Sequence, residues 1–193
     1  MHTEKVVQLM RFFAEKLGGK VSDVKLMKLM YFTDRLSIEE TGYPLSYDDY
    51  YSMNRGPILS GAKNIIDRYE NPLYVAAFNQ TVACKSPKGY SVNLLSLKAP
   101  GVDTENLEED DFDLLSQTDR EIVQRVLDKM GALDDDNVVV YAHDKKVCPE
   151  WEWADGSSKP IKIESILSHL GYSPEQRKSH AAEINYFKNI VAQ

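Results

Sequence analysis

The residues best suited to chemistry lie in one short stretch, "YAHDKKVCPEW", which spans residues 141–151. His143 and Cys148 are five residues apart, and Asp144 lies between them. A histidine can activate a thiol as a nucleophile, and both side chains are common zinc ligands. The spacing matches no established signature, and a buried thiol near a hydrogen-bonded histidine is the more common arrangement. A hydrolase or transferase that uses His143 with Cys148 or Asp144 therefore stays open only as an alternative.

Other chemical motifs are missing from the sequence. It contains neither GxGxxG nor GxxxxGK[ST], and it has no HExxH pair, so the familiar nucleotide loops and zinc helices are not indicated. The acidic clusters at residues 48–49 and 134–136 lack the alternating acids, glycine and distant glutamate of a calcium loop. We interpret both clusters as turn residues. The sequence thus predicts no cofactor and no metal site.

Two tryptophans and an arginine are better candidates for contact with a partner. Trp151 and Trp153 are one residue apart, so in an extended segment they point to opposite sides. One can then pack in the core while the other meets a partner, although both could equally serve only to cover the core. Exposed tryptophan and arginine are frequent at binding hot spots. Acidic residues in the middle of the chain are further candidates. The predicted partner-binding residues are Arg55, Trp151, Trp153, Asp110 and Asp111.

The elements that must position these residues are mostly helical. Apolar spacing, caps and breaks predict helices over residues 3–17, 23–41, 59–70, 116–130, 163–170 and 174–190. Alternation on both sides of "SPKG" predicts a β-hairpin near 81–95, and the tyrosine-rich stretch before Gly56-Pro57 is expected to be extended. "NVVVYAH" is compatible with a strand or a helix. The predicted fold is α+β and mainly α-helical, with about six helices and a small antiparallel sheet.

The stretch "KLMKLMYF", residues 25–32, decides whether a catalytic pocket is expected. Its methionines and leucines follow helical spacing, and no acid, base or nucleophile lies among those positions. Tyrosines can bury their rings and keep their hydroxyl groups at the surface. We therefore interpret this stretch as a core helix, which serves packing and not catalysis.

Length and composition place limits on the class of protein. The 193 residues suit one domain, 1–193, and two cysteines are too few for a disulfide framework. The N-terminus carries charged residues before any apolar run, so it does not resemble a signal peptide. No stretch approaches the roughly 20 apolar residues of a membrane span. We expect a cytoplasmic protein that does not bind membranes.

The net charge of −7 is concentrated in one segment. Residues 103–136 hold 13 acidic and 3 basic side chains, whereas residues 1–102 hold 10 acidic and 13 basic ones. The acidic segment, which begins with a connection over 103–113, would repel nucleic acid and attract a basic protein surface. It could equally be a solvated face. A nucleic-acid-binding regulator stays open as a further alternative because residues 1–102 are mildly basic.

Two segments together resemble a known family. "VKLMKLMYFTDRLSIEETGYPLSYDDYYSMNRGPI" resembles the signature of the Panacea domain, which has a KLxKLxYF helix, a TGxPL break, an aromatic extended stretch and an xGPI turn. Downstream, His143, Asp144 and Trp151 resemble the family's segment of histidine, acid and tryptophan, although Cys148 and Pro149 alter its spacing. The segments stand in the expected order, and the resemblance covers most of residues 3–170.

The resemblance implies a mostly helical fold with a small sheet and no known catalytic residues. Many members, including the SocA-like antitoxins, bind and neutralise protein toxins encoded beside them, and some deliver a toxin to a protease. Others are prophage-encoded and have no assigned role. The function implied for this chain is a non-enzymatic, protein-binding antitoxin. Its implied partners are a toxin encoded by a neighbouring gene and, for an adaptor, a protease complex.

Overall fold

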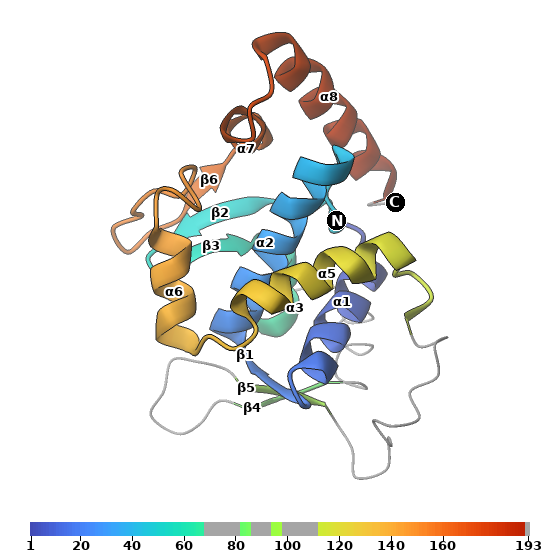
Figure 1. Ribbon diagram of the computed structural model, residues 1–193, viewed down its shortest axis with the longest axis vertical. Coiled ribbons are helices and arrows are strands. Elements are labelled where there is room, and N and C mark those ends of the chain that lie inside the picture. Colours follow the sequence, from blue (N-terminus) through green and yellow to red (C-terminus); the bar gives the residue numbers. More distant parts are fainter. Residues whose placement is uncertain (68–81, 86–93, 98–111, 192–193) are drawn as a thin grey trace.

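The fold consists of helices around one central helix, with two small sheets. A computed structural model describes residues 1–67, 82–85, 94–97 and 112–191 (Figure 1). Seven helices and two three-stranded antiparallel sheets lie in these ranges. The predicted class, α+β and mainly helical, is confirmed. The second sheet was not predicted.

The helices are α1 (Thr3–Lys16), α2 (Asp23–Thr41), α3 (Ser60–Asp67), α5 (Gln117–Met130), α6 (Asp135–His143), α7 (Ile163–His169) and α8 (Pro174–Val191). The strands are β1 (Lys20–Ser22), β2 (Tyr50–Met53), β3 (Gly56–Leu59), β4 (Val82–Lys85), β5 (Leu94–Leu97) and β6 (Lys159–Ile161).

Helix α2 forms the centre of the molecule. Its N-cap is Ser22, whose hydroxyl accepts a hydrogen bond from the Lys25 backbone N–H at 3.0 Å, and its C-cap is Gly42 in the left-handed conformation, with φ 84°. Figure 1 shows α1 and α5 on one side of α2, and α6 and the sheet that contains β2 and β3 on the other. Because α2 is enclosed by other elements, its buried residues are not confined to one stripe.

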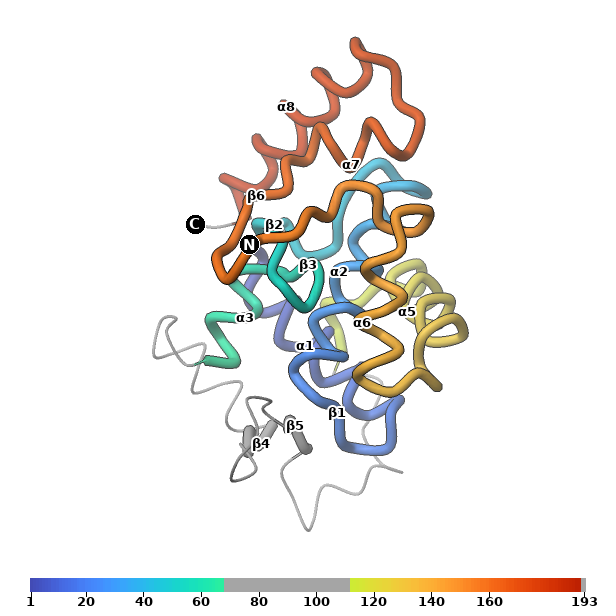
Figure 2. Tube along the Cα trace, turned by 90° about the vertical axis from the view of Figure 1, so that its left-hand side faces the viewer, coloured from blue at the N-terminus to red at the C-terminus, as the bar shows by residue number. Residues whose placement is uncertain are grey.

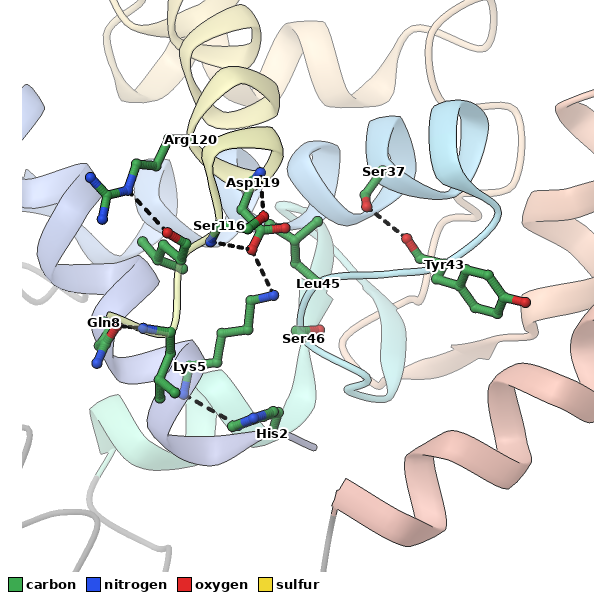
Figure 3. Close-up of polar contacts among 12 residues, drawn as sticks. His2, Lys5, Gln8, Ser37, Tyr43, Leu45, Ser46, Ser116, Asp119 and Arg120 are labelled. Atoms are coloured by element: carbon green, nitrogen blue, oxygen red, sulfur yellow. Dashed lines mark hydrogen bonds and ion pairs between the residues drawn. The ribbon is translucent and has the colours of Figure 1, made fainter. Parts of the chain in front are cut away.

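Helix α5 shows how the sequence marks a helix start. The Ser116 backbone N–H donates to Asp119 Oδ2 at 2.9 Å, and the Asp119 N–H donates to Ser116 Oγ at 3.2 Å (Figure 3). Ser116 and Asp119 are three residues apart, which is the spacing of a reciprocal capping box. The Asp119 carboxylate also pairs with Lys5 Nζ at 2.8 Å, which ties α5 to α1. One acid of the acidic segment is therefore structural.

The first sheet has the order β1-β5-β4 and contains the hairpin predicted near 81–95. Strands β4 and β5 are antiparallel, with Val82 opposite Leu97, and β1 pairs with the other edge of β5. The prediction of this hairpin is confirmed.

The second sheet has the order β3-β2-β6. Strands β2 and β3 form a hairpin whose turn is Asn54-Arg55, so Gly56 and Pro57 already belong to β3. The turn that was expected at Gly56-Pro57 therefore lies two residues earlier, at Asn54-Arg55. Strand β6, more than 100 residues downstream, pairs with β2 from Lys159 to Ile161, a pairing that no local sequence signal indicated.

The stretch "NVVVYAH" is helical. Asp134 caps α6 by accepting from the Asn137 backbone N–H at 2.8 Å, and Val138 and Ala142 are buried. Tertiary contacts thus override the strand propensity of three consecutive valines. Figure 2 shows α6 running beside α2.

Two further predictions concern the acidic connection and a possible membrane span. Of the acidic connection at 103–113, only Phe112 and Asp113 belong to the described residues, and Asp110 and Asp111 lie outside them. Among the helices of the described ranges, none is both long enough and apolar enough to cross a membrane.

Candidate functional site

A set of polar side chains is buried along α2, on the side that faces the second sheet and the segment after α6. Lys28, Tyr31 and Asp34 follow one another at intervals of three residues, so they lie on neighbouring positions of one helical face. Lys28 is 1% exposed, and Tyr31 and Asp34 are fully buried. The interpretation of this stretch as packing material without an acid or base is therefore wrong in part, because it contains a buried amine and ends beside a buried carboxylate.

The first buried contact joins α2 to the segment that follows α6. Tyr31 donates its hydroxyl to Glu150 Oε1 at 2.7 Å, and Arg35 donates Nε–H to the same oxygen at 2.8 Å. Burial, and then the neighbouring Cys148 and Glu150, raise the pKa of Tyr31 well above its ordinary value, so the phenol remains a donor. This arrangement fixes the position of the loop that carries both tryptophans.

Two aspartates organise the chain between α2 and α3. Asp34 accepts hydrogen bonds from the backbone N–H groups of Leu45 and Ser46, both at 3.0 Å, from the Ser46 hydroxyl, and from the Tyr50 hydroxyl at 2.8 Å. Asp48 accepts from two N–H groups at the start of α3, those of residues 61 and 62, each at 2.8 Å. The interpretation of Asp48 as a structural residue agrees with these contacts.

The tryptophan loop, residues 144–158, packs against the β2–β3 hairpin. Trp151 is 6% exposed, and its indole N–H donates to the Met53 carbonyl at 2.9 Å. The ring of His143 stacks on Trp151, with centroids 3.9 Å apart and planes inclined by 11°. Trp153, by contrast, is 56% exposed and meets Trp151 edge to face. The expectation that one tryptophan would be buried and the other exposed agrees with the structure.

Arg55 lies at the hairpin turn beside this loop. The Gly156 N–H donates to Asn54 Oδ1 at 3.1 Å, and the Glu152 N–H donates to Ser52 Oγ at 3.0 Å, so turn and loop are joined. Arg55 is exposed and makes no hydrogen bond or ion pair with the described residues. The structure thus places three predicted partner-binding residues on adjoining segments. We call the surface formed by Arg55, His143, Lys145, Trp151 and Trp153 the tryptophan face.

The geometry does not favour a catalytic pair of His143 and Cys148. The Cys148 thiol is buried, and its hydrogen bond goes to the Tyr31 hydroxyl at 4.0 Å. Burial, and then the charge of Glu150, raise the pKa of Cys148 to about 12, so the thiol stays protonated at neutral pH. Burial, and then the charge of Lys28, lower the pKa of His143. In the described part of the chain, no three His, Cys, Asp or Glu side chains are placed to hold a metal ion.

Sequence reasoning missed the buried polar cluster itself, which consists of the buried Lys28, Tyr31, Asp34 and Glu150 and the partly buried Arg35. A signal for them was present. Apolar residues surround α2 in nearly every direction, and a helix that is apolar all round must be buried. Charged residues in the enclosed middle of this helix, Lys28 and Asp34, are then buried with it. Glu150 carried no such signal, because its partners are more than 100 residues away in the sequence.

The fold and these contacts define a mainly helical α+β protein whose exposed tryptophan and arginine lie on a surface held by a buried polar cluster. A family model described as "Antitoxin SocA-like, Panacea domain" matches residues 26–152. The chain belongs to this family, as the resemblance indicated. Searches of curated proteins and of solved structures gave no significant match.

The matched range has clear structural limits. It begins in the first turn of α2 and ends at Glu152, so it contains the whole buried cluster from Lys28 to Glu150. Helix α1, strands β1 and β6, and the two C-terminal helices α7 and α8 lie outside it. Trp153 is the first residue after the match.

Proposed function

We propose that this protein is a non-enzymatic antitoxin that neutralises a protein toxin, encoded by a neighbouring gene, by binding it directly. The observation that carries the proposal is membership of the SocA-like antitoxin family. The buried thiol of Cys148, held protonated beside Tyr31, supports an activity that does not depend on a cysteine nucleophile.

The tryptophan face is the surface we assign to the toxin. Trp153 presents a large ring to solvent, and it packs on the buried ring of Trp151 rather than on a flexible support. The amine of Lys145 lies 5.3 Å from the centroid of the Trp151 ring, and Arg55 adds a guanidinium that has no partner among the described residues. A preformed aromatic anchor with a free cation nearby has the composition of a binding hot spot.

The function is tested by expressing the neighbouring gene with and without this chain. We expect the neighbouring product to stop growth by itself, growth to return when this chain is present, and the two proteins to copurify. A neighbour that is harmless by itself, or a toxic one whose effect this chain does not relieve, would contradict the proposal.

The surface is tested with Trp153→Ala, and Tyr186→Ala serves as the matched control. Tyr186 is 64% exposed and lies on α8, outside the family match, so both variants remove one exposed aromatic ring. Loss of a hot spot residue costs about 2 kcal/mol, so Trp153→Ala should raise the Kd roughly thirtyfold. Tyr186→Ala should leave the Kd unchanged. The reverse result would move the binding surface to α8.

Delivery to a protease is the remaining alternative within the same family. Direct neutralisation predicts that purified chain inhibits purified toxin without any protease, and that a protease-deficient host is still protected. Protection that disappears in that host, while the complex still forms, would instead identify an adaptor.

A further inference from the structure

A cavity of about 250 Å³ opens between the start of α2, the β2–β3 hairpin and α3. Its volume is slightly below the roughly 300–1,000 Å³ of pockets for drug-sized ligands, which indicates a smaller ligand. Most of the wall is apolar. The apolar lining residues are Val24, Met27, Met53, Ile58 and Ile66.

Lys28 also lines this cavity, and its surroundings are unusual for a lysine. The side chain is 1% exposed, yet its only hydrogen bond in the described structure goes from Nζ to the Pro57 carbonyl, at 3.0 Å. Lysine is almost never fully buried unless it is paired with an acid. Two of the three N–H donors of Lys28 thus have no acceptor among the described residues. No ion pair joins this buried amine to an acidic side chain of the described residues.

The hairpin is shaped around this lysine. Gly56 has φ +104°, and a Cβ at that position would lie 2.8 Å from Lys28 Cε and 3.2 Å from Ala142 Cβ. Only glycine lets β3 pass this close to the amine. The side chain of Lys28 is therefore packed closely against β3 at the wall of the cavity.

The charges near the amine act in opposite directions. Burial, and then the charge of Arg55, lower the pKa of Lys28, whereas Asp23 and Cys148 act in the opposite direction. Lys63 and Asp67, at the other wall, pair with each other. The charged or titratable groups around Lys28 are Asp23, Arg55, Lys63, Asp67, His143 and Cys148.

We propose that this cavity binds a small apolar monocarboxylate, whose carboxylate meets Lys28 and Arg55 and whose apolar body lies against Met27, Ile58 and Ile66. The carboxylate supplies the missing counter-ion, and the apolar walls favour a ligand that carries no second charge. This site faces α3 and shares Arg55 with the tryptophan face, but it is argued from the cavity and does not rest on the proposed toxin-binding function.

Binding should depend on pH in a defined direction. Burial, and then Arg55, lower the pKa of Lys28 to about 7, so the free protein carries the cation mainly below pH 7. A carboxylate binds the protonated form. The affinity should therefore be constant from pH 6 to about 7 and fall about tenfold for each further pH unit.

The test is a calorimetric or NMR titration of the intact chain at pH 6.5. The probes are the monocarboxylates from butanoate to octanoate and 4-phenylbutyrate, each compared with its primary amide, and inorganic phosphate. We expect at least one carboxylate to bind about tenfold or more tightly than its amide. Phosphate, which has no apolar body, should not compete.

The variant Lys28→Met distinguishes binding at this site from nonspecific apolar binding. Methionine is also unbranched and is one atom shorter than lysine, and this variant should remove both the preference for carboxylate over amide and the pH dependence. Lys25→Met is the control on the same helix. The Lys25 amine donates a hydrogen bond to the Gly131 carbonyl, and this variant should keep both properties.

The Lys28→Met variant is expected to fold. Because the native pKa of Lys28 is lowered, the wild-type protein gains stability as the pH rises from 7 toward 10, so Lys28→Met should fold at least as stably at pH 7. Absence of binding by every probe, or an unchanged preference in Lys28→Met, would overturn the proposal.

Discussion

At the scale of single residues, the fold contains buried ionisable side chains whose hydrogen-bond partners come from other segments of the chain. Asp34 is the clearest case, since it collects four hydrogen bonds from the segment that follows α2. Burial raises its pKa to about 6, whereas the hydrogen bonds from Ser46 and Tyr50 act in the opposite direction. The carboxylate thus holds the turn in place, but the ionised form is disfavoured by its surroundings.

Asp34→Asn tests this balance. The native pKa lies above the unfolded value of 3.8, so the folded state binds the additional proton, and wild-type stability should fall as the pH rises from 4 to 6. The asparagine variant lacks this group. It loses the acceptor for two hydroxyl groups and should be destabilised by about 1–3 kcal/mol near pH 4.

The measurement is urea denaturation at several pH values. The stability advantage of the wild type over Asp34→Asn should shrink between pH 4 and pH 6 and then stay constant. All other carboxyl groups are shared by the two proteins, so their titrations cancel in the difference. An advantage that grows over this interval would mean that the hydrogen bonds outweigh burial and that the pKa of Asp34 is lowered.

At the scale of elements, the β2–β3 hairpin is a point where several parts of the structure meet. It pairs with β6 and carries Arg55. Its backbone carbonyls accept hydrogen bonds from the indole N–H of Trp151 and from the amine of Lys28. Its Gly56 has both a positive φ and close neighbours. One backbone position therefore affects the tryptophan face and the cavity together.

Gly56→Ala and Gly156→Ala form a matched pair that separates the two effects. Both glycines have positive φ, +104° and +77°, but a Cβ on Gly156 would have no atom within 4 Å. We expect Gly156→Ala to cost about 1 kcal/mol from backbone strain alone. Gly56→Ala should cost about 1–3 kcal/mol more, because the new Cβ crowds Lys28 and Ala142. Thermal denaturation gives both values, and equal losses would show that the close approach has no energetic consequence.

At the scale of the whole molecule, we infer that residues 1–193 fold as a single domain. The N-terminal residues are tied to the centre through the bond from the His2 N–H to the Ser46 carbonyl, and β6 joins the sheet of β2. Helix α8 is held by the ring of Phe187 against Tyr43 and by the pairing of Lys188 with Asp49. Both ends of the chain thus contact the segment between α2 and β2.

The acidic surface leads to a prediction about association with the toxin. Glu121, Asp128, Asp134 and Asp136 are exposed on α5 and at the start of α6. If the toxin surface is basic, the association rate constant should fall about tenfold or more between about 50 and about 500 mM salt, because screening removes electrostatic steering. Stopped-flow mixing measures this rate constant.

A charge-neutralised variant, Glu121→Gln with Asp128→Asn, should associate more slowly at low salt and show a weaker salt dependence. Thr118→Ala, an exposed neutral change on the same helix, should behave like the wild type. An association rate that does not change with salt in the wild type would mean that the acidic residues are only a solvated face.

The sequence by itself determined most of the local structure and the family. Caps and breaks such as Ser22, Gly42 and the Ser116–Asp119 box act within a few residues, and periodic apolar side chains report burial along one helix, so both can be interpreted without tertiary contacts. Only the tertiary structure decided the helical state of residues 138–140, the pairing of β6 with β2, and the burial of Glu150. Each of these depends on groups that are distant in the sequence. Whether β-prone residues form a helix, a strand edge finds a partner or a charge is buried is decided by the elements that pack against it.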